Sequence, residues 1–162
     1  MTHDVRAVAN FVLSYAKKHG REITNIDVNK LVYFLHAWHL AKTGQPLVGA
    51  KIEAWQYGPV FRELYSQFKV FGDKPISSFA KKRDAKTLEL IDCEIDMKPE
   101  LEAFMVQVLD RYLAMSTGKL VEMSHVSGGP WDIVFNHQAK SNPGMHISNE
   151  SIVEYFGIQT RH

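Results

Sequence analysis

The apolar residues along the chain recur with the period of amphipathic helices. In the first such segment they are three and four positions apart, and the stripe consists of Val5, Val8, Ala9, Val12, Leu13 and Ala16. Gly20 follows this stripe, and Lys17 and Lys18 lie where a helix dipole favours positive charge. The pattern predicts a helix that ends before Gly20.

The second segment is apolar on nearly all sides, which indicates a helix buried in the centre of the fold. Thr24 is a suitable N-cap, and Asp27 stands three residues later as a short variant of the capping box. Gly44, followed by Pro46, ends the segment. We therefore expect a central helix from near Thr24 to Gly44, with Trp38 in the core.

Further helices are predicted in the rest of the chain. One starts at Pro59, because proline fits the first position of a helix, and it stops at Gly72. Another follows Pro99 and keeps its apolar stripe through Tyr112. Shorter helices are expected through His125 with Thr117 as the cap, over Trp131–Gln138, and after the capping residue Ser148.

The segment from Asp73 to Asp96 does not follow a helical period. Apolar and polar residues alternate in part from Leu88 to Ile95, which leaves room for a short β-hairpin in which this stretch pairs with Lys51–Gln56. The predicted fold is mostly α. It is a compact single-domain helical bundle, residues 1–162, around a buried central helix, with this short β-hairpin beside it.

Composition narrows the class of protein. An apolar content of 45% is too high for a disordered chain, and the single Cys93 excludes a disulfide framework and a cysteine-built zinc site. Basic and acidic residues number 19 and 18, a balance that argues against nucleic acid as a partner. Neither a targeting signal nor an apolar run of membrane-spanning length is present, so we expect a cytoplasmic protein with no membrane partner.

No catalytic signature is complete in the sequence. Thr117-Gly118-Lys119 lacks the remaining residues of a P-loop. Cys93 stands between Asp92 and Glu94, whose charges raise the pKa of a thiol, so a buried structural cysteine is favoured over a nucleophile. We therefore expect no catalytic residue, no cofactor and no enzymatic activity.

The histidines offer the remaining candidate for catalysis. His36 and His39 are three residues apart on the central helix and, together with His125, form a weak candidate set of metal ligands. Histidines without nearby Asp or Cys ligands more often make hydrogen bonds in a packed region. That interpretation is favoured, and no metal is predicted.

Aromatic residues gather at two predicted turns. One is the run Trp55-Gln56-Tyr57-Gly58-Pro59-Val60, and the other is Gly128-Gly129-Pro130-Trp131, shortly after His125. Aromatic side chains on rigid turns either anchor a core or contact a partner, and chemistry alone favours the core. The candidate partner-binding residues are Trp55, Tyr57, Gly58, Pro59, Val60, His125 and Trp131.

Three separate motifs are similar to those of a known family. Residues 24–44 resemble the family's second helix, and Glu53–Val60 resembles its E-A-W-x-Y-G-P-V motif. Met123–His125 and Gly128–Trp131 resemble its Leu-Ser/Thr-His and G-x-P-W elements. Over nearly the whole chain, the sequence resembles the Panacea domain, also called SocA-like or GepA-like and formerly a domain of unknown function. The stretch Asp73–Lys98 is the least family-like.

The resemblance implies an antitoxin that neutralises a cognate toxin by direct protein–protein binding. Panacea proteins are encoded beside small toxins of unrelated kinds and also occur in phages and mobile elements. One branch delivers its toxin to a Clp-type protease, so a proteolytic adaptor is the first alternative, and a His-based metal-dependent hydrolase is the second. Some members carry an added DNA-binding domain, for which this chain has no room. The toxin's identity and the oligomeric state are left open.

Overall fold

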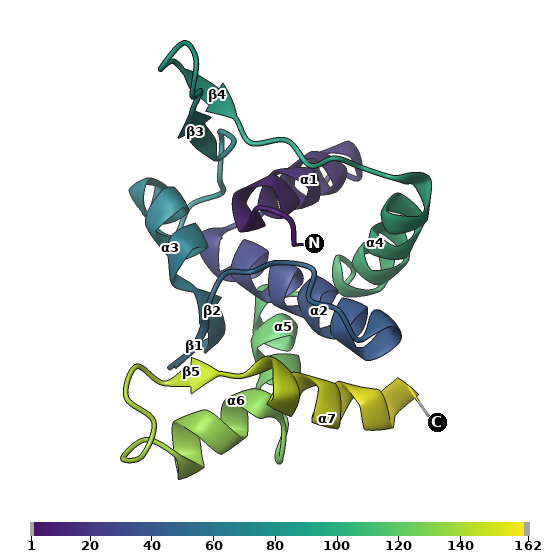
Figure 1. The fold of residues 1–162 in the computed structure, drawn as a ribbon, viewed down its shortest axis with the longest axis vertical. Coiled ribbons are helices and arrows are strands. Elements are labelled where there is room, and N and C mark those ends of the chain that lie inside the picture. The colour runs from purple at the N-terminus through teal and green to yellow at the C-terminus, as the bar shows by residue number, and fades with distance from the viewer. Residues whose placement is uncertain (1, 161–162) are drawn as a thin grey trace.

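In the computed structural model, which describes residues 2–160, helix α2 (Asn25–Thr43) runs through the middle of the molecule (Figure 1). The hydroxyl of Thr24 accepts a hydrogen bond from the backbone N–H of Asp27, and the Asp27 carboxylate accepts one from the Thr24 N–H. Gly44 ends the helix with a φ of 75°. Most of α2 is buried, which confirms the predicted central helix and its caps.

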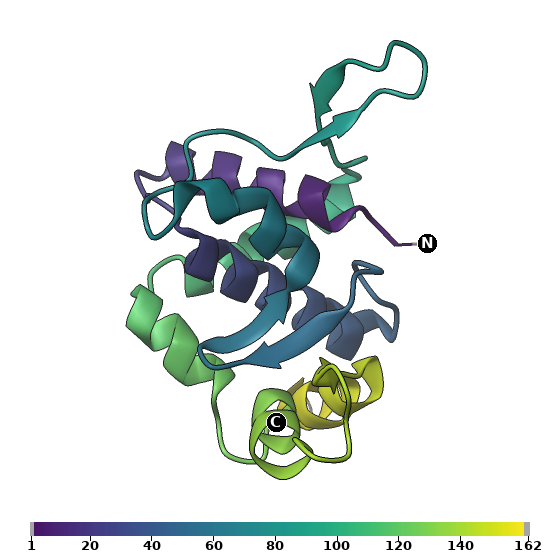
Figure 2. The ribbon, with the colours of Figure 1, turned by 90° about the vertical axis from the view of Figure 1, so that its left-hand side faces the viewer.

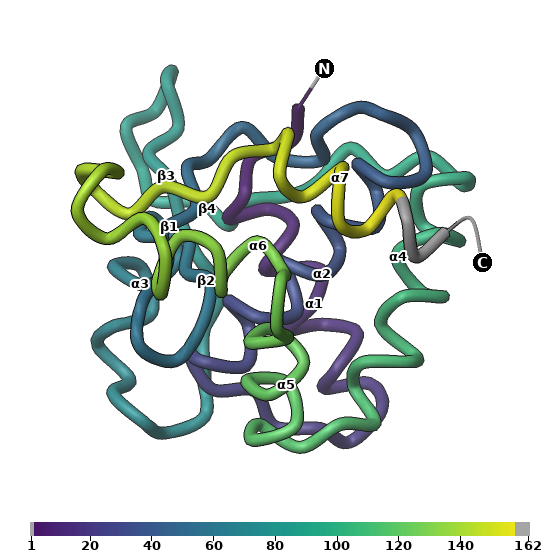
Figure 3. The backbone as a smooth tube through the Cα atoms, turned by 90° about the horizontal axis from the view of Figure 1, so that it is seen from below, coloured from purple at the N-terminus to yellow at the C-terminus, as the bar shows by residue number. Residues whose placement is uncertain are grey.

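The helices that pack on α2 include α1 (Val5–Lys18), α4 (Pro99–Tyr112), α5 (Thr117–Ser124) and α7 (Asn149–Thr160). Seen from below, α5, α7 and the short helix α6 (Pro130–Asp132) lie in front of α2 (Figure 3). The predicted cap of α5 is wrong by one residue, because Ser116 accepts the capping hydrogen bond from the Lys119 N–H. The Thr117 hydroxyl instead donates to Asp27 and ties α5 to the start of α2.

A three-stranded sheet lies against α2. Its central strand β1 (Ile52–Trp55) pairs antiparallel with β2 (Gly58–Phe61) through a two-residue turn. The other edge of β1 pairs with β5 (His146–Ile147). Residues 52 to 54 and all of β2 are buried, so this small sheet is part of the core rather than a surface ribbon.

The predicted helix start at Pro59 is wrong. Pro59 lies in β2 opposite Ala54, and α3 (Arg62–Phe68) begins three residues later. Contacts with other elements keep this segment in a strand instead of a helix. The backbone N–H of Phe61, in the same strand, donates to the Asn29 side chain at 2.9 Å. After α3, the short 3₁₀ turn η1 (Lys69–Phe71) ends at Gly72, the predicted stop.

A second hairpin projects from the body as an arm (Figures 1 and 2). It consists of β3 (Lys81–Arg83) and β4 (Leu90–Asp92), which pair antiparallel. The predicted pairing of Leu88–Ile95 with Lys51–Gln56 is therefore wrong. The chain reverses locally between β3 and β4, where the Asp84 carboxylate accepts two backbone hydrogen bonds, while both edges of β1 are taken by β2 and β5.

The remaining elements close the lower part of the molecule. Helix α6 (Pro130–Asp132) continues into the π-helical turn η2 (Ile133–His137), and Ser148 caps α7 by accepting from the Ser151 N–H. Trp38 is half-buried and donates to the Tyr112 hydroxyl at 2.8 Å, so it packs against the core rather than within it. The mostly α fold is confirmed.

The predicted domain of residues 1–162 extends past the described range by Met1, Arg161 and His162. Within residues 2–160, no helix has both the length and the apolar character needed to cross a bilayer. Cys93 is buried as expected, and this burial raises the pKa of its thiol.

Candidate functional site

Three segments that are far apart in the sequence meet at the turn between β1 and β2. Helix α2 contributes Lys30, whose amine donates to the carbonyl oxygen of Pro59 at 2.8 Å. Helix α6 contributes Trp131, whose indole N–H donates to the carbonyl oxygen of Trp55 at 2.7 Å. The turn is therefore held from both of its strands, and each of the three sequence motifs supplies one of the parts.

Gly58 lies directly against the side chain of Lys30. Its φ is +113°, and a Cβ atom at this position would be 2.6 Å from both Lys30 Cε and Ser124 Oγ. A larger residue would strain the backbone and also displace both side chains. Glycine is thus required at this position for the conformation of the turn and for the packing of Lys30 beneath it.

Lys30 carries an amine in the interior of the protein. The residue is 1% exposed, and burial lowers its pKa to about 7, against a smaller opposing effect of Asp27. An exposed lysine keeps its charge to far higher pH, because water solvates the ammonium form. Near neutral pH the Lys30 amine is thus divided between its charged and neutral forms.

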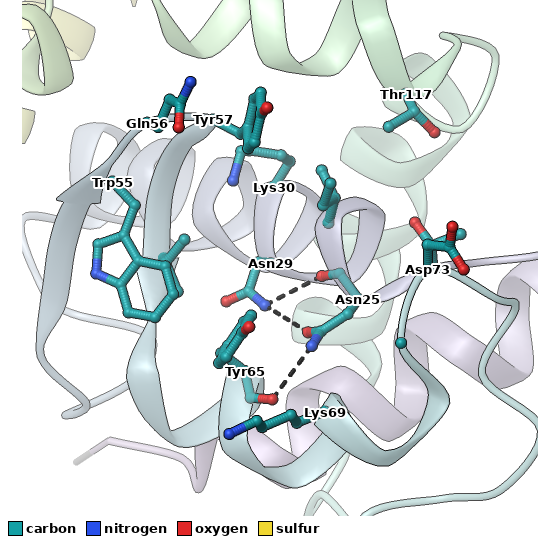
Figure 4. Close-up of a pocket in the computed structure, with 14 residues that line it drawn as sticks. Asn25, Asn29, Lys30, Trp55, Gln56, Tyr57, Tyr65, Lys69, Asp73 and Thr117 are labelled. Atoms are coloured by element: carbon teal, nitrogen blue, oxygen red, sulfur yellow. Dashed lines mark hydrogen bonds between the residues drawn. The ribbon is translucent and has the colours of Figure 1, made fainter.

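A pocket of about 660 Å³ opens beside Lys30 (Figure 4). Its rim bears exposed apolar and aromatic side chains, namely Ile26, Tyr57 and Tyr65. Trp55 forms one wall and packs edge-on against the Tyr65 ring, with 4.8 Å between the ring centroids. The pocket therefore combines an aromatic rim with a buried amine at its wall.

Two buried asparagines join the elements around the pocket. The Asn29 amide donates to the backbone and side-chain oxygens of Asn25, and the Asn25 amide donates to the carbonyl oxygen of Tyr65 (Figure 4). Asn29 Oδ1 accepts from the Phe61 N–H. Helix α2, strand β2 and helix α3 are therefore fixed relative to one another, and the pocket is formed before any ligand arrives.

Trp131 and His125 stack behind the turn. Their ring centroids are 3.7 Å apart and the rings are almost parallel, at 6°. Burial lowers the pKa of His125, and the positive charge of Lys30 lowers it further. His125 Nε2 is buried without a hydrogen-bond partner among the described residues. The neutral ring is thus favoured, and it acts as a flat packing surface for Trp131.

The seven predicted partner-binding residues gather at this site but do not share one role. Tyr57 is exposed, while Trp55 and His125 are half-buried. The buried residues are Gly58, Pro59, Val60 and Trp131. Tyr57 and Trp55 are therefore the members that a partner can reach, and the buried members hold the turn in place.

The three candidate metal-ligating histidines have other surroundings. His36 is buried, with Nε2 2.9 Å from Asn149 Oδ1 and Nδ1 accepting from the Val48 N–H. His39 Nδ1 lies 2.7 Å from the carbonyl oxygen of Gln45, and His125 stacks on Trp131. In residues 2–160, no group of three or more His, Cys, Asp or Glu residues is placed to hold a metal ion.

Sequence reasoning missed most of the residues that line the pocket, among them Asn25, Asn29, Lys30 and Tyr65. A signal was present in α2, where Asn29 and Lys30 interrupt a helix that is otherwise apolar on nearly all sides. Polar residues in a fully buried segment need partners, so their presence indicates a built polar site.

The fold and the pocket define a small helical domain with a preformed pocket that is rimmed by aromatic side chains. A family model described as "Antitoxin SocA-like, Panacea domain" matches residues 28–132. The chain is also 35% identical, over 161 residues, to Antitoxin SocA of Caulobacter vibrioides (strain NA1000 / CB15N). That similarity covers 96% of this chain and 84% of the relative. The chain therefore belongs to the SocA-like Panacea antitoxin family, as its three motifs predicted. No solved structure matches it significantly.

Proposed function

We propose that this protein is an antitoxin that neutralises a cognate toxin by binding it directly. Family membership supports the antitoxin role. The observation that supports direct binding is Tyr57, a large aromatic side chain that is 57% exposed at the edge of a preformed pocket. Tyrosine is enriched among the residues that dominate protein–protein binding energies.

The turn that carries Tyr57 is held in a single position. Lys30 bonds to the carbonyl after the turn and Trp131 bonds to the carbonyl before it. A surface that is already ordered loses little conformational entropy when a partner binds. The rim formed by Tyr57, Tyr65 and Ile26 is therefore suited to contact the toxin.

A non-catalytic role is part of this proposal. The two nitrogens of His36 face Asn149 and Val48, which supports a structural histidine over a ligand of a hydrolytic metal. Elemental analysis of protein purified without a tag is expected to find no stoichiometric metal. A bound metal in stoichiometric amount would favour the metal-dependent hydrolase. A cytoplasmic location stays a prediction from the sequence.

The proposal is tested by expressing the small open reading frame next to this gene, alone and together with this protein. We expect growth arrest when it is expressed alone, growth when both proteins are present, and a complex of the two in a pull-down. Toxicity that persists in the presence of this protein, with no complex, would contradict the proposal.

The same experiment separates direct binding from the proteolytic adaptor. In a strain that lacks Clp-type proteases, rescue with an unchanged amount of toxin is expected if binding alone neutralises the toxin. Rescue that disappears in this strain would favour the adaptor. Toxin levels measured by immunoblot in both strains provide the control.

A further inference from the structure

The amine of Lys30 has unused hydrogen-bonding capacity at the wall of the pocket. An ammonium group has three N–H donors, and within residues 2–160 this one donates to a single acceptor, the Pro59 carbonyl oxygen. Lys30 forms no ion pair with any described residue. A buried charge without a counter-charge is costly, so a ligand that supplies one binds favourably.

The neighbouring groups do not supply the missing negative charge. Asp27 is the acidic group that acts on Lys30, but its carboxylate already accepts hydrogen bonds from Thr24, Thr117 and Arg21. His125 adds positive rather than negative charge when it is protonated. Asp73 also lines the pocket, but Figure 4 shows it at the end opposite Trp55.

We propose that the pocket receives an acidic side chain of the partner protein, whose carboxylate pairs with the Lys30 ammonium. This inference rests on the proposed function, in which that partner is the toxin. A carboxylate forms charge-assisted hydrogen bonds with an ammonium group, and these are stronger than neutral ones. Lys30 is therefore the residue that selects for negative charge.

The size and lining of the pocket describe the rest of the occupant. Its volume of about 660 Å³ is larger than one carboxylate needs, and Tyr57, Tyr65 and Ile26 surround the opening. The lining residues of α2 extend from Asn25 to Lys30, along the first turns of the helix. The occupant is thus an apolar segment with an Asp or Glu side chain that points to Lys30.

The test uses two short apolar peptides that are blocked at both ends and differ only in a central glutamate or glutamine. Each peptide is titrated at millimolar concentration into the full chain, and amide resonances are followed by NMR. The glutamate peptide is expected to bind at least about tenfold more tightly, because glutamine accepts only a weaker hydrogen bond from the ammonium and supplies no counter-charge. Resonances of Asn25, Asn29 and Tyr57 are expected to shift.

Two variants make the test specific for Lys30. Lys30→Met keeps the shape of the buried side chain without the amine, and the preference for glutamate is expected to disappear. Lys69→Met removes a cation that also lines the pocket but is exposed, and the preference is expected to persist. Circular dichroism checks that both variants are folded. An absent preference in the wild type, or one that survives in Lys30→Met, would overturn the inference.

The carboxylate site and the antitoxin function can fail independently of each other. Toxin neutralisation by the wild-type chain without any glutamate preference would overturn the carboxylate site alone. A preference that depends on Lys30, combined with a failure to neutralise the neighbouring toxin, would overturn the antitoxin proposal and retain an acidic protein ligand for the pocket.

Discussion

The two hairpins of this molecule differ in how they are held. The β1–β2 hairpin is buried beside α2 and receives hydrogen bonds from Lys30 and Trp131 next to its turn. The β3–β4 arm projects from the body (Figure 2), and its base is held by hydrogen bonds of the Asn10 side chain. The Asn10 side chain donates to the carbonyl oxygens of Ala80 and Cys93 and accepts from the Ala80 N–H.

The hairpins nevertheless expose apolar side chains to a similar degree. Tyr57 is 57% exposed on the first hairpin, and Leu90 is 56% exposed on the arm. Tyr57 borders a preformed pocket, whereas Leu90 lies on a short strand that pairs with an exposed one. Exposure alone therefore does not identify a binding surface, and rigidity and a neighbouring pocket distinguish the two regions.

The largest effect is expected from Lys30 of α2, whose buried amine holds the β1–β2 hairpin. The folded state holds the Lys30 pKa at about 7, while the unfolded chain has the ordinary value of 10.5. Between these pH values the unfolded state binds more protons, so the free energy of unfolding rises with pH by about 5 kcal/mol relative to Lys30→Met. Below pH 7 the difference in the free energy of unfolding between the two proteins is expected not to change with pH, because Lys30 is protonated in both the folded and the unfolded state.

Urea denaturation of the wild type and of Lys30→Met at a series of pH values measures this effect. The variant is the control, since every other titrating group is common to both proteins. If the free energy of unfolding changed with pH in the same way in both proteins, the Lys30 amine would be solvated and not buried beneath the β1–β2 hairpin.

The second effect comes from the turn itself. Gly58→Ala places a Cβ atom 2.6 Å from Lys30 Cε on a backbone with a φ of +113°. We expect a loss of about 3 kcal/mol in the free energy of unfolding, from backbone strain and overpacking together. Gly20→Ala is the matched control, because its φ is +76° and no heavy atom lies within 4 Å of the added Cβ.

Gly20→Ala is expected to lose about 1 kcal/mol, the contribution of the left-handed conformation alone. Chemical denaturation of both variants gives the difference, which measures how tightly the first hairpin packs on α2. Equal losses in the free energy of unfolding of the two variants would mean that the close packing around Gly58 does not stabilise the fold.

The third effect concerns the base of the arm. Asn10→Ala removes three hydrogen bonds and leaves the Ala80 N–H without its acceptor, and we expect a loss of about 2 kcal/mol. Hydrogen exchange is expected to become faster at the Ala80 amide, while the Phe61 amide of the first hairpin stays protected. Equal acceleration at both amides would mean that the two hairpins do not open independently.

The smallest effects on stability are expected at the two exposed side chains. Tyr57→Ala and Leu90→Ala should each change the free energy of unfolding by less than about 0.5 kcal/mol, because substitutions at exposed positions seldom disturb the fold. Thermal denaturation checks this. A large loss for either variant would show that its side chain supports the fold, and the pair would then not serve as a matched test of binding.

How far the sequence predicted the molecule depends on whether a feature is local. The start and end of α2 were predictable because the Thr24 and Asp27 capping box and Gly44 act within a few residues. Pro59 was assigned to a helix because proline suits a first helical position, but its pairing with Ala54 places it in a strand. Such pairing depends on contacts that no local pattern encodes.

The same distinction holds for the site. The motifs around Trp55, Tyr57 and Trp131 were predicted as candidates from their residue types and turns. That Lys30 lies beneath Gly58 was not predictable, because the contact joins residues of separate elements. The polar interruption at Asn29 and Lys30 gives the residues but not their partners. The pairing of β3 with β4 is local, and a turn signal at Asp84 was available for it.

We propose that the β1–β2 hairpin, and not the β3–β4 arm, contacts the toxin. The most direct measurement is the affinity of the purified toxin for wild type, Tyr57→Ala and Leu90→Ala by isothermal titration calorimetry. Tyr57→Ala is predicted to weaken binding by about tenfold or more, and Leu90→Ala by less than about twofold. Weaker binding with Leu90→Ala and unchanged binding with Tyr57→Ala would assign the contact to the arm instead.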